Sequence, residues 1–355
     1  MLSLKGSKTR YGVSQEELGS LLDEEPSYRA VQIWEGLYKE CQPLSSITNI
    51  SKHLRDKLEK DLPLSLNVIE ESVSDDGETT KTLFGLYDGS SIETVLMHYG
   101  DRTTVCVSSQ AGCAMGCQFC ATGQSGFDRH LSTGEIVEQV VRSIWHSKPR
   151  RISNVVFMGM GEPLANFDSV WSAVERIHAD IGISARQITV STVGVVPGIR
   201  RISEKGLPVK LAVSLHAAND DLRNQLVPIN RQYGLDSLIQ ACDEYLTKKR
   251  RRISFEWAMI DGINDRENDA RELATVAISL RAHVNLIPLN PTPGYPMMGS
   301  PMKKVKGFHR LLRSLGVNAT IRNNRGTSIS AACGQLRLNQ GVVVDQETIV
   351  PPIKS

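Results

Sequence analysis

Long apolar runs are missing from this chain of 355 residues. No stretch approaches the roughly 20 consecutive apolar residues that a membrane-spanning helix needs. The first residues also contain no apolar segment of the kind that forms the centre of a signal peptide. We therefore expect a cytoplasmic protein with no membrane partner. Internal repeats and low-complexity tracts are missing as well, and the length is sufficient for one large domain with an appendage.

An excess of charge of one sign is also missing. The net charge is only +2, so the overall charge does not indicate a nucleic-acid partner. Basic residues nevertheless cluster at positions 150–151, 200–201, 248–252 and 303–306. Such clusters could neutralise phosphates, or they could be solvated residues at the ends of helices. The charge pattern alone leaves both interpretations open.

A fourth cysteine is missing from the most informative motif of the chain. Cys113, Cys117 and Cys120 have the spacing C-x3-C-x2-C, with no further close ligand. A structural zinc site usually needs four protein ligands, whereas three thiolates can hold three irons of a 4Fe–4S cluster and leave the fourth iron open. We predict an open cluster site, and the alternative is a zinc site that a distant histidine completes. Seven cysteines, three of them thiolates, fit a reducing compartment.

Strand and helix patterns alternate after residue 100. Before it, residues 15–62 have apolar residues at helical spacing, and residues 80–97 indicate a β-hairpin with a turn at Asp88 and Gly89. Six β-branched or apolar runs predict strands at 103–108, 154–160, 187–191, 209–215, 253–260 and 284–289. Amphipathic segments predict helices at 133–147, 167–177, 235–247, 266–280 and 305–315. Six βα units are too few for a closed eight-stranded barrel, so we predict an α/β fold with a partial (β/α)6 barrel.

Small and polar residues follow four of the predicted strands. Glu162 follows the second strand, Ser191 the third, Ser214 and His216 the fourth, and Asn290 the sixth. Each of these residues alone is more often a satisfied structural group. Because the carboxyl ends of parallel strands meet at one edge, we expect them to converge on the cluster loop. A carboxylate at position 162 could accept a hydrogen bond from a ligand ammonium group.

The four remaining cysteines lie outside the cluster motif. Cys41 and Cys242 lie in helical patterns, where a thiol usually acts as a small apolar group. Cys106 lies in the first predicted barrel strand, and Cys333 lies among small residues near the C-terminus. For these two, an inert thiol and a reactive thiol are both compatible with the sequence.

The run CAMGCQFC resembles the signature of the radical S-adenosylmethionine superfamily. Together with FMGMGEPLAN, STVGVVPGI, AVSLHA, LIPLNPTPG and AACGQL, it makes residues 28–336 resemble the RlmN/Cfr family. Members of this family methylate an amidine carbon of adenine in RNA. The resemblance implies a 4Fe–4S cluster, two molecules of S-adenosylmethionine per turnover, an RNA substrate and an electron donor such as flavodoxin or ferredoxin. Nothing in the sequence suggests an obligate dimer, so we expect a monomer.

The resemblance assigns roles to individual residues. Cys113, Cys117 and Cys120 would hold the cluster. Cys333 would carry the methyl group, Cys106 would resolve the protein–RNA adduct through a transient disulfide with Cys333, and Glu93 would accept a proton. The residues implied to bind S-adenosylmethionine are Gly161, Glu162, Ser191, Ser214, Leu215, His216 and Asn290.

The resemblance also implies a target for the reaction. The target would be carbon 2 of adenosine 2503 in 23S rRNA, at the peptidyl-transferase centre, and of adenosine 37 in some tRNAs. Methylation of carbon 8 of the same rRNA adenosine is the close alternative, and a non-catalytic RNA-binding protein with a structural metal site is the distant one.

We divide the chain into a helical RNA-binding domain (1–70), a β-hairpin linker with Glu93 (71–100), the partial barrel with the Cys333 loop (101–345) and a tail (346–355).

Overall fold

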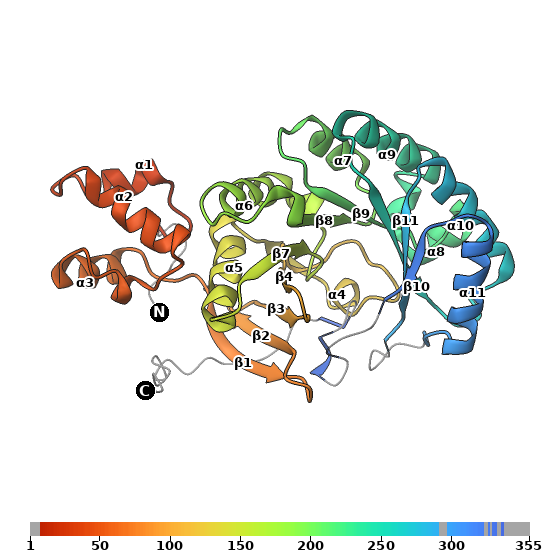
Figure 1. Ribbon diagram of the computed structural model, residues 1–355, viewed down its shortest axis with the longest axis horizontal. Coiled ribbons are helices and arrows are strands. Elements are labelled where there is room, and N and C mark those ends of the chain that lie inside the picture. Colours follow the sequence, from red (N-terminus) through yellow and green to blue (C-terminus); the bar gives the residue numbers. More distant parts are fainter. Residues whose placement is uncertain (1–7, 291–296, 323–325, 327–328, 332–334, 337–355) are drawn as a thin grey trace.

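The computed structural model describes residues 8–290, 297–322, 326, 329–331 and 335–336. In Figure 1 the first three helices lie to one side of a curved sheet whose outer face is covered by helices. These first helices are α1 (Gln15–Ser20), α2 (Tyr28–Trp34) and α3 (Lys52–Asp61). Ser14 begins α1 with a capping box, in which its hydroxyl accepts from the Glu17 N–H and Glu17 accepts from the Ser14 N–H. Helix α2 continues into a π-helical turn at Glu35–Lys39.

One sheet of ten strands forms the centre of the described part of the molecule. Its order is β1-β2-β3-β4-β7-β8-β9-β10-β11-β12. The first strands, β1 (Asn67–Val73), β2 (Thr79–Gly85), β3 (Ser91–His98) and β4 (Thr103–Cys106), are antiparallel to one another. From β4 onward every pairing is parallel, through β7 (Ile152–Phe157), β8 (Ile188–Thr192), β9 (Lys210–Ser214), β10 (Ile253–Met259), β11 (His283–Pro288) and β12 (Ala319–Ile321).

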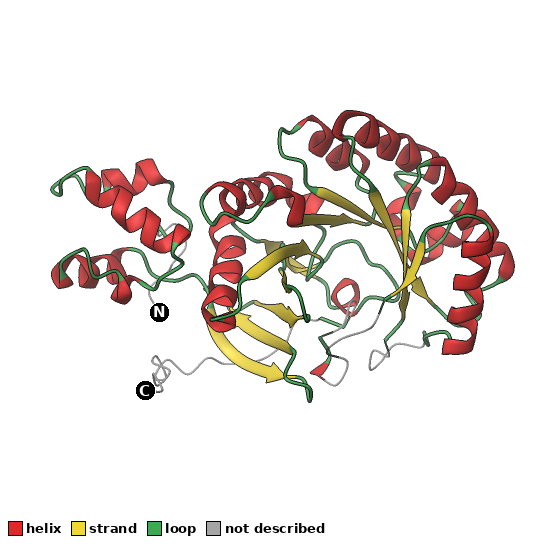
Figure 2. Ribbon diagram, in the orientation of Figure 1, coloured by secondary structure: helices red, strands yellow, loops and turns green. Residues whose placement is uncertain are grey.

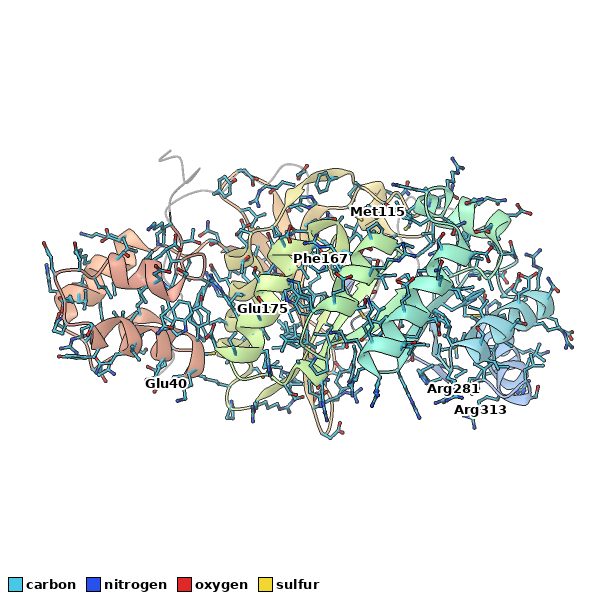
Figure 3. The ribbon with its side chains drawn as sticks, turned by 90° about the horizontal axis from the view of Figure 1, so that it is seen from above. Glu40, Met115, Phe167, Glu175, Arg281 and Arg313 are labelled. Carbon is cyan, nitrogen blue, oxygen red and sulfur yellow. The ribbon has the colours of Figure 1, made fainter. Side chains whose placement is uncertain are left out.

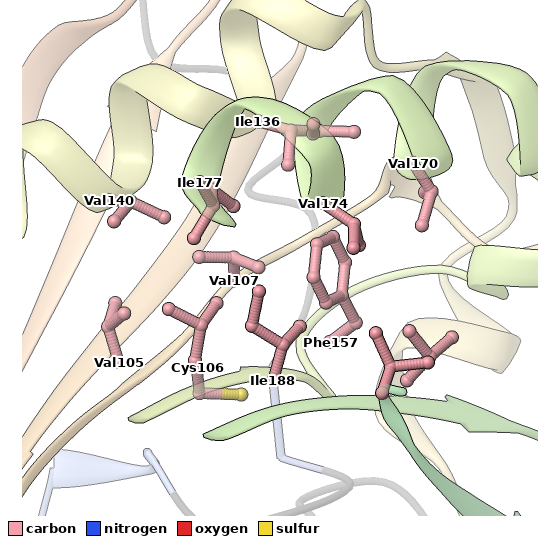
Figure 4. Packing of buried hydrophobic residues seen from close by; sticks show 14 of the residues in the cluster. Val105, Cys106, Val107, Ile136, Val140, Phe157, Val170, Val174, Ile177 and Ile188 are labelled. Carbon is pink, nitrogen blue, oxygen red and sulfur yellow. The ribbon is translucent and has the colours of Figure 1, made fainter. Parts of the chain in front are cut away.

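Helices cover the outer face of the parallel strands (Figure 2). They are α5 (Thr133–Ser147), α6 (Phe167–Ala179), α7 (Val196–Glu204), α9 (Leu235–Lys249), α10 (Glu267–Ser279) and α11 (Met302–Ser314), whereas the short helix α8 (Asp220–Leu226) follows β9 and its Leu226 carbonyl accepts from the Gln118 N–H. Between α5, α6 and the sheet lies a core of buried apolar side chains. In Figure 4, Val107 of the chain after β4 and Ile188 of β8 lie below Ile136 of α5 and Val174 of α6. These apolar contacts pack the helices against the outer face of the curved sheet.

The N-terminal segment is joined to the barrel by buried polar contacts. The Glu138 carboxylate of α5 accepts from the backbone N–H groups of Ser65 (2.7 Å) and Leu66 (3.2 Å). At Gly134 on the same helix, a Cβ atom would lie 2.6 Å from the Gly12 nitrogen, so a side chain there would keep the two segments apart. The segments on either side of the first helices, at Gly12 and at Ser65 and Leu66, thus contact α5 directly.

The predicted partial barrel is confirmed, and six predicted strands and five predicted helices lie within a few residues of the observed ones. The hairpin is confirmed as β2 and β3, but β1 adds a third antiparallel strand that the sequence pattern did not indicate. The short parallel strand β12 extends the six predicted parallel strands by one. Strand β1 spans the predicted boundary at residues 70 and 71, and the domain division remains a proposal. No helix among the described residues is long and apolar enough to cross a membrane.

Candidate active site

A short loop after β4 carries the three cysteines of the motif. Strand β5 (Gln110–Gly112) pairs with β6 (Phe127–His130), and the two strands close the loop at its base. Cys113 donates its N–H to the Gly126 carbonyl at 2.7 Å, and Cys120 lies at the N-terminus of α4 (Ala121–Gln124). Gly112 has φ +76°, and a Cβ atom there would lie 2.2 Å from the Gly126 oxygen. Glycine is therefore required at the base of the loop.

This loop lies at the carboxyl end of the parallel strands. Figure 3 shows Met115 of the loop at one edge of the molecule and Arg281, which precedes β11, at the opposite edge. The same end holds a cavity of about 1040 Å³ that is open to solvent. The residues around it that the sequence analysis singled out are Cys113, Cys117, Cys120, Gly161, Glu162, Ser191, Ser214 and His216. The structure therefore brings the predicted strand ends and the cysteine loop to one place.

Two of the three thiols are in an environment that disfavours an unpaired thiolate. Burial raises the pKa of the Cys113 thiol to about 12 and raises the pKa of the Cys117 thiol well above its usual range. For Cys117, the guanidinium group of Arg223 opposes this rise. Thiolates at this loop would thus need a positively charged partner, such as iron, to offset the loss of solvation.

Glu162 is buried at the mouth of the strands and is held by backbone groups. Its carboxylate accepts from the N–H of Leu164 at 2.9 Å and from the N–H of Val193 at 2.8 Å. Burial raises the pKa of the Glu162 carboxyl to about 7, although these N–H groups favour the ionised form. A cationic ligand group in the cavity would favour ionisation, as the predicted ammonium contact requires.

The residues at the end of β9 differ in how they reach the cavity. Ser214 and His216 line it, whereas Leu215 is fully buried and donates its N–H to the Glu256 carbonyl at 3.0 Å. His216 has φ +59°, and its Nδ1 accepts from the N–H of Ala258 at 2.9 Å. Burial lowers the pKa of the His216 imidazole to about 3, so the ring is neutral at physiological pH. Asn290 is buried beyond β11 and is not among the described residues that line the cavity.

Comparisons with known proteins agree with this geometry. The Radical SAM superfamily matches residues 107–274. A relative from Chloroflexus aurantiacus, a probable dual-specificity RNA methyltransferase RlmN, is 45% identical over 95% of each chain. A relative of the same name from Corynebacterium diphtheriae is 47% identical over 88% of each chain. The crystal structure of a radical SAM methyltransferase from Sphaerobacter thermophilus has a TM-score of 0.90 and 47% identity, covering 93% of this chain and 99% of that one.

The chain belongs to the RlmN family. Membership of this radical SAM family implies S-adenosylmethionine and a 4Fe–4S cluster. Within the described ranges, no three His, Cys, Asp or Glu side chains converge on a single point. In a cluster each cysteine binds a different iron atom. Three cysteines of one loop, all of which line the cavity, fit such a cluster.

A buried arginine supports this RlmN-family site, and the sequence analysis did not identify it. Arg223 of α8 is fully buried and donates to the carbonyls of Val193 (2.5 Å), Ser214 (3.3 Å) and Leu215 (3.1 Å). It also donates to Oδ1 of Asn230 at 2.7 Å. Burial lowers the pKa of the guanidinium to about 10. One side chain thus fixes the loops after β8 and β9 around the cavity.

Glu93 lines a second cavity, of about 700 Å³. It lies on β3 between β2 and β4 and is only 5% exposed, so it is not a surface carboxylate on an edge strand. Lys81 of the neighbouring strand pairs with it at 2.8 Å. Gln335 lines this second cavity and Leu336 lines the first. The C-terminal segment therefore borders both cavities at consecutive residues.

Of the two cysteines outside the loop with predicted catalytic roles, Cys106 and Cys333, only Cys106 is among the described residues. Cys106 ends β4, is buried, and pairs with Val95 of β3 and Val156 of β7. In Figure 4 its sulfur points away from Val107 and from the helices, as the alternation of strand side chains requires. Cys333 lies outside the described residues. The pairing of the two sulfurs remains a prediction.

Proposed function

We propose that this protein methylates an adenosine in RNA, with S-adenosylmethionine as the methyl source and a 4Fe–4S cluster on Cys113, Cys117 and Cys120. The observation that supports this most is the shared cavity, in which the three cysteines face Glu162 and His216 at the strand ends. The full-length similarity to relatives named as RNA methyltransferases points the same way. When bound, the cluster and S-adenosylmethionine would supply a carbon radical, which ordinary side chains cannot generate.

The polar groups of the cavity suit the binding of S-adenosylmethionine. Glu162 offers a buried carboxylate for the amino group of the ligand. Ser191 and Ser214 add hydroxyl groups at the ends of β8 and β9. The apolar side chains of Met115 and Phe119 line the same cavity and would exclude water from the reacting groups. Leu215 and Asn290, which are buried and do not line the cavity, would also contribute to the binding of S-adenosylmethionine.

We extend the proposal to the target and the protein side of the reaction. The target is carbon 2 of adenosine 2503 in 23S rRNA and of adenosine 37 in some tRNAs. Cys333 carries the methyl group, two molecules of S-adenosylmethionine are used per turnover, and the carbon bonds to the adenine to give a covalent adduct. The adduct would give up one electron to the oxidised cluster, and Glu93 would take the proton from the adenine carbon. The Cys106 thiolate attacks the Cys333 sulfur, so that an S–S bond forms as the bond to the RNA methylene carbon breaks, and this carbon keeps the electron pair and gains a proton to become the methyl group.

The second cavity supports the role of Glu93. The carboxylate is buried beside Lys81, and the residues Ile329, Ser330 and Gln335 on either side of Cys333 in the sequence line the same space. A base in this position would meet an adenine that is extruded from its RNA, since enzymes that modify a base take it out of the stack. We also expect a cytoplasmic monomer that receives electrons from flavodoxin or ferredoxin.

Metal analysis of anaerobically purified protein tests the cluster. We expect brown protein with about four irons and four sulfides per chain, and loss of both in Cys117→Ala. Zinc without iron would favour the structural-metal alternative.

Mass spectrometry of rRNA and tRNA from cells that express the protein tests the target. We expect methyl groups on carbon 2 of the rRNA adenosine and of the tRNA adenosine. A methyl group on carbon 8 alone would instead support the close alternative.

The roles of the two further cysteines are tested by trapping the adduct. Cys106→Ala should accumulate protein that is covalently joined to RNA, because no thiol is available to release it. Cys333→Ala should form no adduct, because the methyl carrier is absent. Normal turnover by Cys106→Ala would contradict the resolving role. Gel electrophoresis after nuclease digestion distinguishes these outcomes.

A further inference from the structure

Two charged residues in the wall of the main cavity have no role in the function proposed so far. Glu256 lies in the middle of β10, and Arg322 directly follows β12. Both line the cavity that holds the cysteine loop. The Glu256 side chain is 5% exposed and that of Arg322 is 34% exposed. A charged pair in this position is unexpected, because the inward face of a barrel is usually filled by apolar side chains.

Only one of the two carboxylate oxygens of Glu256 accepts hydrogen bonds from the described residues. Oε1 accepts from the Ser254 hydroxyl at 2.9 Å and from the Asn285 amide at 2.8 Å. Oε2 is buried and has no hydrogen-bond partner among the described residues. A guanidinium nitrogen of Arg322 lies 3.5 Å from it, which is an ion pair at a length beyond a good hydrogen bond. The neighbours thus fix the carboxylate and leave one acceptor without a hydrogen bond, in a residue that lines the cavity.

The surroundings of this acceptor are suited to a flat ring. Met158, Ala258 and Ile287 line the same cavity, and the Met158 sulfur lies 3.9 Å from Arg322 Nη1. Apolar walls bind the faces of a heterocycle, while an adjacent acceptor and donor bind its edge. Adenine offers the complementary edge, since its 6-amino group is a donor and the neighbouring ring nitrogens are acceptors. A buried acceptor that lacks a partner also penalises a ring without that amino group.

We propose that Glu256 and Arg322 read the polar edge of an adenine ring. Oε2 of Glu256 accepts from the 6-amino group, and the guanidinium of Arg322 donates to a ring nitrogen. The inference rests on the proposed function, which places two adenines near this cavity: the target base of the RNA and the adenine of S-adenosylmethionine. Both present the same edge, so two experimental arms are needed to distinguish them.

Glu256→Gln tests this reading with a defined change. The amide oxygen must replace Oε1 as the acceptor for Ser254 and Asn285, so the amide NH2 points to where Oε2 was. An acceptor thereby becomes a donor that opposes the 6-amino group. The matched control is Glu244→Gln, a carboxylate that pairs with Arg200 on the outer helices. Circular dichroism checks that both variants fold.

The first arm uses short RNAs with either adenosine or purine riboside, which lacks the 6-amino group, at the target position. Equilibrium binding and kcat/KM are measured for each. If the target base is read, we expect the wild-type protein and Glu244→Gln to prefer adenosine by about 10- to 100-fold. Glu256→Gln should reduce this ratio to about 1. Arg322→Lys should weaken binding of both RNAs and keep part of the preference.

The second arm uses S-adenosylhomocysteine and its analogue with purine in place of adenine. The binding of each is measured for the wild-type protein, Glu244→Gln and Glu256→Gln. If the cofactor adenine is read, the loss of preference in Glu256→Gln occurs in this arm. A wild-type preference that persists in Glu256→Gln in both arms would overturn the proposal, as would equal weakening of all ligands with unchanged ratios. A wild-type protein that methylates no RNA would contradict the proposed function, yet the binding ratios would still test adenine reading.

Discussion

Arg223 shows how one buried side chain can determine the shape of a site. Its guanidinium bonds to three carbonyls that belong to the loops after β8 and β9. Arginine suits this position because its donors form a rigid planar fork, which a lysine ammonium cannot reproduce. The cavity edge at Ser214 therefore depends on a residue of α8 that does not itself line the cavity.

Replacing Arg223 should destabilise the protein strongly. In Arg223→Met the three carbonyls and the Asn230 amide lose the guanidinium as a donor, and we expect the free energy of unfolding to fall by about 3 kcal/mol or more. Arg223→Lys should recover only part of it. Urea unfolding measures the change, with the exposed Arg231→Met as a control that should shift by less than about 0.5 kcal/mol. Equal effects at the two positions would contradict this account.

His216 makes the stability of the cofactor-free protein depend on pH. The pKa of its imidazole is lowered from 6.5 to about 3 by burial, so the unfolded chain binds a proton that the folded protein excludes. Its contribution is fully present above pH 6.5 and is lost as the pH falls toward 3. Between pH 7.5 and pH 5 the loss is about 2 kcal/mol.

The variant His216→Asn isolates this contribution. Asparagine tolerates the positive φ and can accept from the Ala258 N–H, but it does not titrate. Denaturant unfolding at both pH values should show that wild-type protein loses about 2 kcal/mol more than the variant. Parallel losses in the two proteins would show that other groups cause the acid sensitivity.

At the scale of elements, the parallel strands could be predicted and the antiparallel ones only partly. Strands such as β7, β8 and β9 have no exposed residue, and each contains apolar and β-branched residues whose pattern is visible in the sequence. Strand β1 is exposed along most of its length and contains Glu70 and Glu71, so its conformation depends on pairing with β2. The strands β5 and β6 are three and four residues long, too short for a pattern.

The residues of the site also divide into those that could be predicted from the sequence and those that could not. Glu162, Ser191, Ser214 and His216 could be predicted because topology alone places strand ends together. Arg223 and Glu256 could not, because one comes from a seven-residue helix and the other from the middle of a strand. Their importance depends on contacts with residues that are distant in the sequence.

Strands β2 and β3 are joined by the pair of Lys81 and Glu93, which is largely buried. Lys81→Met removes the ammonium and leaves a buried carboxylate without this partner, so we expect a loss of about 3 kcal/mol. The double variant Lys81→Met with Glu93→Gln should be more stable than Lys81→Met alone, because it removes the buried charge as well. A double-mutant cycle measured by urea unfolding gives the coupling energy. Additive losses would show that the two side chains do not stabilise each other.

At the scale of the whole molecule, the first helices and the barrel are connected through α5. Glu138 is fully buried on this helix and accepts from Ser65 and Leu66, directly after α3. Arg142 on the next turn of α5 donates to the Leu66 carbonyl at 2.6 Å. Further contacts join the same parts, since Trp145 of α5 donates to the Cys41 carbonyl at 2.8 Å and Trp34 of α2 donates to Asp180 at 3.2 Å.

Glu138→Ala should loosen this connection while the barrel remains folded. Two buried N–H groups lose their acceptor, and we expect a destabilisation of about 2 to 4 kcal/mol. Hydrogen exchange should show faster exchange at the N–H groups of Ser65 and Leu66, while β8 and β9 stay protected. His146→Ala, a partly exposed change on the same helix, should alter neither measurement, because its ion pair with Glu71 lies at the surface. Uniformly faster exchange across the barrel would show instead that α5 stabilises the fold as one unit, and that the N-terminal helices are not held separately.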